Sequence, residues 1–359
     1  MKQLKDYSDE INKCSKCGLC QSVCPVFKLT GNDCAVSKGK FIMLDGVLKG
    51  DLKLSKTINK YLEMCLKCDK CSKFCPSGID VCEIFSTAKA EYLKNSYEGK
   101  VVKFIESEGV FDRLINIAGK FNRVKSLQYH KNPAKTLLFF KGCANKISPS
   151  SEKAIKKIFS KLPYKLIDSN DLKCCGVPFL SSGNIERYES VEQYNSNIIN
   201  NTECDCVITD CASCLSALNK YKNLNKPIVD VIEILSDTSA EFNFKKHLRV
   251  TFHKPCHFNG YDKFLKLIQK CKNIEYVEMP NYDDCCGFAG QFALTNRKLS
   301  IEISKNKIKN ALSVTPDIIL TECPACILGL KQGLSHTRYK KKPKIMNVTE
   351  FLAMSEIKN

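Results

Sequence analysis

The sequence lacks the segments that direct a chain out of the cell or into a membrane. Residues 1–7 contain no apolar stretch, so we expect no secretory signal. No run approaches the roughly 18 apolar residues that a membrane-spanning helix needs. We therefore expect a cytoplasmic protein that is either free or peripheral on the inner face of a membrane.

Common signatures of nucleotide binding and of hydrolytic catalysis are also absent from the sequence. Neither the glycine fingerprint of a dinucleotide fold nor a P-loop occurs, which argues against binding of FAD, NAD or ATP by this chain. No set of serine, histidine and aspartate is ordered as in a hydrolase. The net charge of +18 comes mostly from scattered lysines, without a basic arm or interleaved aromatics. We therefore expect a solvated basic surface and no nucleic-acid partner.

Cysteine is the residue type that the sequence has in excess, with 23 among 359 residues. The length allows two or three domains, and the 43% hydrophobic content is typical of globular proteins. A protein in a reducing compartment keeps many thiols to bind metal or to perform redox chemistry, because disulfides do not persist there. The positions of the cysteines are therefore the main guide to function.

Residues 1–95 contain two copies of one cysteine run, each closed by proline. The spacing C-x2-C-x2-C-x3-C-P begins at Cys14 and again at Cys65, and it is the spacing of bacterial two-cluster ferredoxins. Three cysteines of a run can wrap three corners of a cubane, and the fourth is then free to reach the other cluster. We predict an α-helical, ferredoxin-like domain with two [4Fe–4S] clusters. The first cluster is assigned to Cys14, Cys17, Cys20 and Cys75. The second cluster is assigned to Cys65, Cys68, Cys71 and Cys24.

Zinc is the alternative for this region because C-x2-C pairs also suit zinc knuckles. Two complete four-cysteine runs, each ending in Cys-Pro, favour iron–sulfur clusters instead. Cys34 and Cys82 match no motif, so we expect them to be buried packing residues.

Residues 96–135 contain no cysteine and form a predicted helical linker. Between residues 101 and 124, apolar residues alternate with charges in the pattern of an amphipathic helix, which usually faces a core. Nearby lysines leave a second interpretation open, in which the helix lies against a membrane or a membrane partner. The apolar stripe consists of Val102, Ile105, Val110, Phe111, Leu114, Ile115, Ile117 and Phe121.

The second half of the chain contains a duplicated unit, which we divide into domains at residues 136–246 and 247–359. Each copy has one cysteine, then a Cys-Cys-Gly triplet, then a C-x2-C pair. Equivalent cysteines lie 113, 111 and 112 residues apart, so the period is that of a domain and not of a solenoid repeat. The first quintet is Cys143, Cys174, Cys175, Cys211 and Cys214. The second quintet is Cys256, Cys285, Cys286, Cys323 and Cys326.

Each copy has the pattern of a small α/β unit. Strands are expected near residues 136–140, 165–167 and 207–209 in the first copy and near 249–252, 275–278 and 318–321 in the second. Alternating strands and helices predict a parallel sheet, in which sites form beyond the carboxyl ends of the strands. All five cysteines of each copy follow strands or lie near helix starts, so we expect them to converge at that edge.

Five convergent cysteines favour a metal centre with several metal ions. Adjacent cysteines are poorly placed to bind one ion together, but they can reach neighbouring irons of a cluster. Gly176 and Gly287 permit the tight turn after each pair, and helix N-termini near Cys211 and Cys323 would stabilise thiolate charge. A structural zinc site, a redox-active dithiol and simple burial are the alternatives, although two matched quintets argue against burial.

The paired quintets resemble the CCG, or cysteine-rich, domain. This domain occurs in heterodisulfide reductase and in iron–sulfur subunits of glycolate oxidase, anaerobic glycerol-3-phosphate dehydrogenase and lactate-utilisation complexes. An eight-cysteine module followed by two such domains is most similar to the glycolate oxidase iron–sulfur subunit. The segments CGLC at residue 17, SKGK at residue 37 and CPSG at residue 75 fit that pattern, and the resemblance covers nearly the whole chain.

The resemblance implies an oxidoreductase subunit with an electron-transfer role. A separate FAD-dependent subunit would oxidise glycolate, D-lactate or a related 2-hydroxy acid. This chain, without a site for an organic substrate, would pass the electrons towards quinone or another acceptor. In a heterodisulfide-reductase-like alternative, the quintets would hold noncubane clusters that cleave a disulfide, with Cys285, Cys286 and His257 as candidate catalytic residues. The iron–sulfur subunit of a glycerol-3-phosphate dehydrogenase is a further alternative.

Two histidines and three more cysteines could act at the quintets or remain unused. His253 and His257 bracket Cys256 and could donate hydrogen bonds to cluster sulfurs or move protons. A hydrogen-bonded structural role is the alternative, and we favour it for His253. The cysteines outside the repeat are interpreted as spare thiols; these are Cys204, Cys206 and Cys271.

Overall fold

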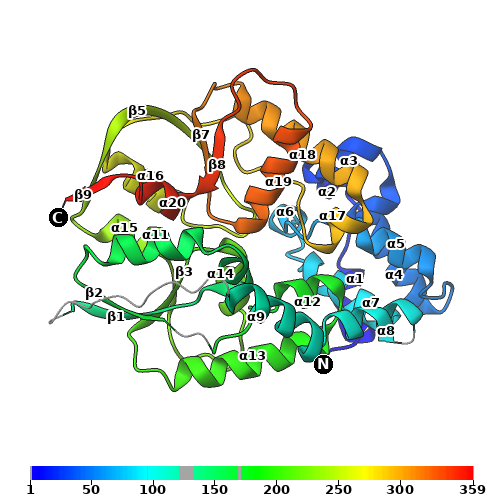
Figure 1. The fold of residues 1–359 in the computed structure, drawn as a ribbon. Coiled ribbons are helices and arrows are strands. Elements are labelled where there is room, and N and C mark those ends of the chain that lie inside the picture. The colour runs from blue at the N-terminus through cyan, green and yellow to red at the C-terminus, as the bar shows by residue number, and fades with distance from the viewer. Residues whose placement is uncertain (1, 95, 121–132, 169–170, 359) are drawn as a thin grey trace.

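The computed structural model describes residues 2–94, 96–120, 133–168 and 171–358 of the chain. It consists of a helical N-terminal region, a short helical linker and two α/β domains (Figure 1). The first strand begins at Lys135, so every regular element described before it is a helix.

The N-terminal region is a set of short helices around one apolar core. Its largest buried side chains include Phe41, Leu44 and Phe85, with the rings of Phe41 and Phe85 5.3 Å apart. Residues that begin or end helices separate these elements. Pro25 begins α3, left-handed Gly50 ends α4, and Ser55 is the N-cap of α5. The elements are η1 (Leu4–Tyr7), α1 (Ser8–Asn12), α2 (Leu19–Val23), α3 (Pro25–Thr30), η2 (Asp33–Ala35), α4 (Ser37–Lys49), α5 (Lys56–Glu63), α6 (Lys70–Lys73) and α7 (Val81–Lys94).

The sequence predicted that the linker buries its apolar stripe, but part of that stripe is exposed. It forms α8 (Tyr97–Ile105), a π-helical turn η3 (Glu108–Asp112) and α9 (Arg113–Lys120). Phe111 packs on Phe179 with ring centroids 4.9 Å apart, but Ile105, Leu114 and Ile117 are 52%, 63% and 47% exposed. The π-turn changes the helical period, so the stripe does not continue along one face. Phe121 lies outside the described residues. None of the helices in the described ranges is both long and apolar enough to cross a membrane.

The two α/β domains contain sheets of the same topology. The strands of the first sheet are arranged in the order β2-β1-β3-β4, and those of the second in the order β6-β5-β7-β8, with all these pairs parallel. The predicted duplication of a parallel α/β unit is therefore confirmed in the fold. The strands are β1 (Lys135–Phe139), β2 (Tyr164–Asp168), β3 (Cys206–Thr209), β4 (Ile228–Asp230), β5 (Glu241–His253), β6 (Cys271–Tyr276), β7 (Ile318–Thr321) and β8 (Lys344–Asn347).

Register supports the same conclusion, because Leu137 pairs with Cys206 and the equivalent Val250 pairs with Ile318. Two features of the second sheet were not predicted. β5 begins at Glu241, so the division drawn between residues 246 and 247 falls inside this strand, and β9 (Glu356–Lys358) pairs antiparallel with its start.

Helices cover both faces of each sheet, and the inner helices join the two domains. Helices α11 and α15 of the first domain pack against α20 and α16 of the second, between the two sheets (Figure 1). The shared core contains Phe139, Ile155, Phe252, Phe264 and Phe351. The helices of the first domain are α10 (Gly142–Ile147), α11 (Ser150–Phe159), α12 (Val177–Ser182), α13 (Ile185–Asn200), α14 (Ala212–Leu218) and α15 (Val231–Asp237). Those of the second are α16 (Tyr261–Gln269), α17 (Gln291–Thr295), α18 (Arg297–Leu312), α19 (Pro324–Ser335) and α20 (Val348–Leu352).

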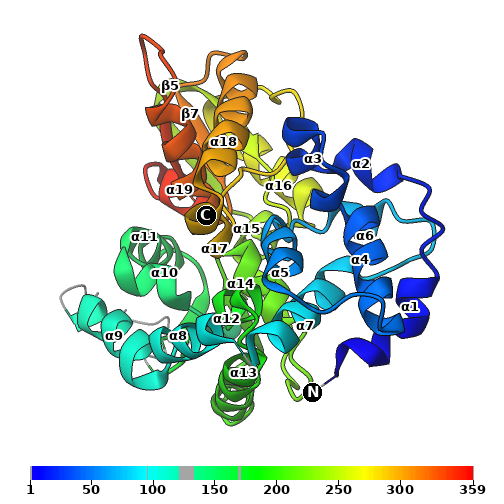
Figure 2. The ribbon, with the colours of Figure 1, turned by 90° about the vertical axis from the view of Figure 1, so that its right-hand side faces the viewer.

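The N-terminal region packs against the cysteine-bearing side of both α/β domains. Helix α3 contacts α18, α5 contacts α17, and α7 contacts α12 (Figure 2). Lys70 forms an ion pair with Asp284 at 2.7 Å across this interface. A small apolar cluster at the interface includes Leu66, Cys285 and Phe292. The fold thus brings cysteines of the first 95 residues next to cysteines of the duplicated half.

Candidate metal centres

The first hollow of the N-terminal region is lined by the four cysteines assigned to the first cluster. Its volume is about 420 Å³. Gly18, with φ +84°, turns the chain between Cys17 and Cys20 so that both thiols border the same space. The lining thiols are Cys14, Cys17, Cys20, Cys75 and, also from the second run, Cys71. The last cysteine of the second run therefore reaches the loop of the first run, although cluster binding itself stays a prediction.

The second hollow is lined by the four cysteines assigned to the second cluster and by one more thiol. Its volume is about 390 Å³. The Lys67 backbone amide donates a hydrogen bond to Cys65 Sγ at 3.4 Å. Cys82, which we interpreted as a packing residue, also borders this space, whereas Cys34 lines neither hollow. The lining thiols are Cys24, Cys65, Cys68, Cys71 and Cys82.

Lysine ammonium groups next to these hollows indicate that negative charge belongs there. Lys40 is 2% exposed and donates to the Ala35 carbonyl at 2.7 Å. Lys67 donates to Ser86 Oγ at 2.5 Å, and burial lowers its pKa to about 8. A buried ammonium is costly unless negative charge compensates it. Clusters held by thiolates would supply that charge, so the residues present fit anionic [4Fe–4S] clusters.

The first quintet converges at the carboxyl end of its sheet. Cys143 Sγ lies 3.6 Å from Cys174 Sγ, and Cys175 Sγ lies 3.4 Å from Cys214 Sγ. Cys211 and Cys214 pack in the same buried cluster as Cys174 and Cys175. The convergence expected from the strand–cysteine pattern is thus present in the structure.

The second quintet repeats this arrangement. Cys286 Sγ lies 3.3 Å from Cys326 Sγ, and Cys323 packs in the same buried cluster as both. Cys256 and Cys285 lie together in the cluster at the interface with the N-terminal region. All ten cysteines are buried or half-buried. The residue types fit a metal centre with soft thiolate ligands.

Glycine and helix termini shape both quintets as the sequence predicted. Gly176 and Gly287 follow the cysteine pairs with φ of +84° and +82°, a region that other residues rarely adopt. Cys211 and Cys323 are the N-cap residues of α14 and α19. Their thiols therefore lie where a helix dipole favours negative charge.

The second thiol of each cysteine pair has a lowered pKa. Hydrogen bonds from Cys174 and Cys214 lower the pKa of Cys175 to about 5. In the same way, Cys285 and Cys326 hold the pKa of Cys286 well below its usual value. Equivalent positions of the two domains thus share a preference for the thiolate, which is the form that binds metal.

Contacts between thiols also join the three cysteine groups to one another. Cys68 packs in the same apolar cluster as Cys256 and Cys285 of the second quintet. Cys211 of the first quintet and Cys323 of the second adjoin each other, since the Ala212 amide donates to the Glu322 carbonyl at 2.8 Å. Ser213 Oγ lies 3.5 Å from Cys323 Sγ at the same point. The sulfurs therefore form a continuous row that runs from the second hollow through the second quintet to the first.

Three buried carboxyl groups next to this row were missed by the sequence reasoning. Burial raises the pKa values of Asp210 and Asp230 to about 7, and raises that of Glu322 well above its usual value. Asn145 Nδ2 donates to Asp210 Oδ1 at 3.0 Å, whereas neither Glu322 oxygen has a partner among the described residues. The repeated segments TDC at residue 209 and TEC at residue 321 were the available signal.

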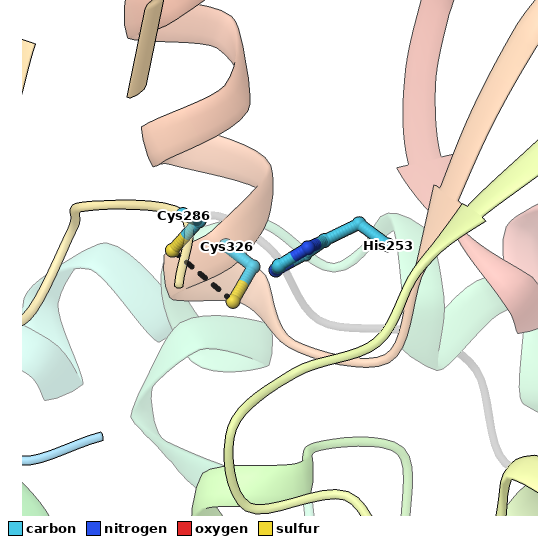
Figure 3. A group of neighbouring side chains, drawn as sticks. All are labelled: His253, Cys286 and Cys326. Atoms are coloured by element: carbon cyan, nitrogen blue, oxygen red, sulfur yellow. Dashed lines mark hydrogen bonds between the residues drawn. The ribbon is translucent and has the colours of Figure 1, made fainter. Parts of the chain in front are cut away.

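The two histidines beside Cys256 have different surroundings. His257 is half-buried, whereas His253 is fully buried and its ring points toward two sulfurs of the second quintet (Figure 3). The ring and the Sγ atoms of Cys286 and Cys326 offer donor atoms that all lie within 4.8 Å of one another. Neither ring nitrogen has a hydrogen-bond partner in the described parts of the chain. The hydrogen bonds expected of a structural His253 are thus not seen in the described parts of the chain, and its role stays a prediction.

The remaining cysteines of the duplicated half lie away from the row. Cys206 and Cys271 are buried in the core shared by the two α/β domains. Cys204 packs at the edge of the first domain's outer core. Their placement agrees with their interpretation as spare thiols.

Two known domain families match the chain. The cysteine-rich (CCG) domain matches residues 137–219 and 250–331, and the 4Fe-4S dicluster domain matches residues 10–79. These ranges contain the two quintets and both proline-closed runs. Each module predicted from the cysteine spacing is therefore matched by the corresponding family.

Relatives with assigned names are similar over almost the whole chain. A component of the fumarate reductase (CoM/CoB) of Methanothermobacter marburgensis is 25% identical, over 98% of this chain and 74% of the relative. The glycolate oxidase iron-sulfur subunit of Escherichia coli is 23% identical, over 88% of each chain. A component of the dihydromethanophenazine:CoB–CoM heterodisulfide reductase of Methanosarcina acetivorans is 21% identical, over 90% of this chain and 89% of the relative.

Among solved structures, a hypothetical protein from Helicobacter pylori has a similar fold. The TM-score is 0.56 at 13% sequence identity, and the match covers 90% of this chain and 67% of that one. At this identity the likeness concerns the fold alone.

Proposed function

We propose that this chain, an iron–sulfur protein of the CCG type, is the electron-transfer subunit of a flavin-linked 2-hydroxy-acid dehydrogenase. A partner FAD-dependent subunit would oxidise glycolate or D-lactate, and this chain would pass the electrons towards quinone or another acceptor. The similarity to the Escherichia coli glycolate oxidase iron-sulfur subunit supports this proposal. The observation that carries it is the continuous row of sulfurs between the N-terminal hollows and both quintets.

The row implies an order for the redox centres. Cys71 borders both N-terminal hollows, Cys68 joins the second hollow to the second quintet, and Cys323 joins the second quintet to the first. We propose two [4Fe–4S] clusters in the hollows and one further iron–sulfur centre in each CCG domain. Iron–sulfur clusters supply one-electron carriers when bound, and the protein sets their spacing and surroundings. The first CCG domain is then the end of the row that lies farthest from the N-terminal region.

Substrate assays with and without the partner test this proposal. The chain is purified anaerobically alone and together with its co-purifying flavoprotein, and each sample receives glycolate, D-lactate or glycerol-3-phosphate with a dye acceptor. We expect turnover of a 2-hydroxy acid by the complex and none by the isolated chain. Turnover by the isolated chain contradicts the proposal, and turnover of glycerol-3-phosphate alone favours the glycerol-3-phosphate dehydrogenase alternative.

Metal analysis separates iron from zinc in the CCG domains. Two [4Fe–4S] clusters account for about eight irons per chain. We expect clearly more than eight irons, with a matching amount of sulfide. About eight irons with two zincs would instead assign zinc to both quintets.

Cleavage of a disulfide is a second candidate, favoured by the contact between two intact quintets. The Cys211–Cys323 contact places the two quintets side by side, and relatives include a heterodisulfide reductase component and a fumarate reductase named for CoM and CoB. The reaction would be RS–SR′ plus two electrons and two protons, giving RSH and R′SH, with the electrons supplied through the N-terminal region.

Reduced protein tests this candidate directly. It should cleave a mixed disulfide of two small thiols, and Cys285→Ala should abolish cleavage while the N-terminal [4Fe–4S] signals persist. Absence of cleavage by the fully loaded wild-type protein excludes the candidate. Because the assay contains no hydroxy acid, its result is independent of the dehydrogenase test.

A further inference from the structure

A fully buried imidazole lies next to the cysteines of the second quintet. His253 is the last residue of β5 and has 0% exposure. Its ring and the Cys286 and Cys326 sulfurs present three donor atoms within 4.8 Å of one another (Figure 3). Strand alternation explains this direction, because Phe252 points into the shared core and the next side chain points to the opposite face.

No described protein group satisfies the ring. Both nitrogens lack a hydrogen-bond partner of good geometry within the described ranges, and the nearby Tyr282 carbonyl accepts from the Lys254 amide at 3.0 Å. Buried polar groups are almost always paired in native proteins, so an orphaned ring next to metal-ligating residues calls for an explanation. A metal centre held by the neighbouring thiolates would provide the missing partner.

An imidazole nitrogen is a suitable donor for such a centre. A neutral imidazole has a free lone pair on one nitrogen, which is the donor that iron and zinc accept from histidine.

The first domain has no such donor at the equivalent position. His253 precedes Cys256 by three residues, and Phe140 precedes Cys143 by three. Phe140 is also fully buried and packs in the cluster that contains Cys175 and Cys214. The same backbone position therefore presents a hydrocarbon ring to the first quintet and an imidazole to the second.

We propose that His253 is a sixth, nitrogen ligand of the metal centre in the second CCG domain. The two CCG centres then differ in their ligands: five thiolates in the first, and five thiolates with one imidazole in the second. This inference rests on the part of the proposed function that places a metal centre at the second quintet. At an iron–sulfur centre the imidazole is the sixth ligand. A structural zinc ion takes four ligands, so there the imidazole would bind together with three of the thiolates.

The experiment uses the full chain, purified or reconstituted anaerobically with iron and sulfide and labelled with ¹⁵N-histidine. Pulsed electron paramagnetic resonance is recorded on the second CCG centre. We expect a directly coordinated nitrogen coupling in wild-type protein that changes with the isotope. The coupling should disappear in His253→Phe and persist in His257→Asn, the matched control for the other histidine beside Cys256. If the quintet holds zinc, zinc-edge X-ray absorption should show one nitrogen at about 2.0 Å that is lost in the same variant.

His253→Phe is expected to fold because phenylalanine occupies the equivalent site of the first domain. Even without that variant, the wild-type and His257→Asn spectra decide the question. A metal-loaded second quintet without a coordinated histidine nitrogen overturns this inference alone. A second quintet that binds no metal overturns it together with the proposed CCG centre, and metal analysis distinguishes the two results.

Discussion

The two CCG domains have the same strand order, the same register and the same five cysteines, yet their surroundings differ. The second quintet touches Cys68 of the N-terminal region and faces His253 and Lys307. The thiols of the first quintet contact one another and Cys323 of the second, and they pack near Phe140. The two domains thus share one frame of cysteines, and the packing against the N-terminal region gives the two quintets different neighbours. In the proposed electron path, the second domain is an intermediate station and the first is the terminal one.

The largest expected effect comes from removing one cysteine ligand, either in the second domain or in the first. Cys286→Ser should remove the second centre and also stop electrons from reaching the first, because the row of sulfurs passes through the second quintet. Cys175→Ser should remove only the first centre. We expect reduction of the first centre by a reduced N-terminal region to slow at least about 100-fold in Cys286→Ser, measured by freeze-quench electron paramagnetic resonance. Equal behaviour of the two variants would show that the domains are parallel and not sequential stations.

The glycines after the cysteine pairs should respond unequally to alanine. Both have positive φ, but a Cβ at Gly287 would lie 2.8 Å from the Ser300 backbone oxygen, whereas at Gly176 it would meet the Tyr188 ring at 2.7 Å. A ring can move more easily than a helix backbone, so we expect destabilisation of about 3 kcal/mol for Gly287→Ala and about 2 kcal/mol for Gly176→Ala. Gly31→Ala is the control, because its Cβ meets nothing within 4 Å, and should cost about 1 kcal/mol. Chemical denaturation of the anaerobic protein measures the three values, and a larger loss for Gly176→Ala would contradict this expectation.

The capping residues Asp230 and Asn347 provide a comparison in pH dependence. They occupy equivalent ends of β4 and β8, and each accepts a hydrogen bond from a helix amide, that of Ile232 at 2.8 Å and that of Thr349 at 2.9 Å. Burial raises the pKa of Asp230 to about 7, so the folded state binds more protons than the unfolded state between about pH 4 and pH 7. This carboxyl group therefore makes stability fall as pH rises through that window.

Asp230→Asn gives the first domain the same residue as Asn347 in the second, and it should remove this loss of stability with rising pH. We expect the free energy of unfolding to rise by about 1–2 kcal/mol at pH 8 and to change little at pH 4. Denaturation at a series of pH values checks this. Asp262→Asn, at an exposed position, serves as the control. If Asp230→Asn loses as much stability between pH 4 and pH 8 as the wild-type protein does, the raised pKa does not belong to Asp230.

Much of the fold and the convergence of the cysteines within each domain could be predicted from the sequence, because both depend on local periodicity. Alternating strands and helices predicted the parallel sheets, and the position of cysteines after strands predicted convergence within each domain. What lies between domains could not be predicted in this way. The Cys68–Cys285 and Cys211–Cys323 contacts depend on how three units pack, which no repeat period encodes. The exposure of apolar residues in the linker was not predicted, because a π-turn interrupts the helical period on which the expected buried stripe depends.

The smallest expected effect concerns the charge beside each quintet. Burial lowers the pKa of Lys307 on α18 to about 8, and nearby acidic groups that include the Cys286 thiolate partly offset this. Reduction adds negative charge to a centre, and a nearby ammonium stabilises that charge, so Lys307→Met should lower the reduction potential of the second centre by about 50 mV. Lys309→Met, exposed on the same helix, should leave the potential unchanged.

In the first domain, Lys146 is only half-buried beside Cys143 and Cys174, so Lys146→Met should lower the potential of the first centre by less. Redox titration followed by electron paramagnetic resonance measures both centres in one sample. A larger shift at the first centre would mean that its environment, and not that of the second, is the more enclosed one.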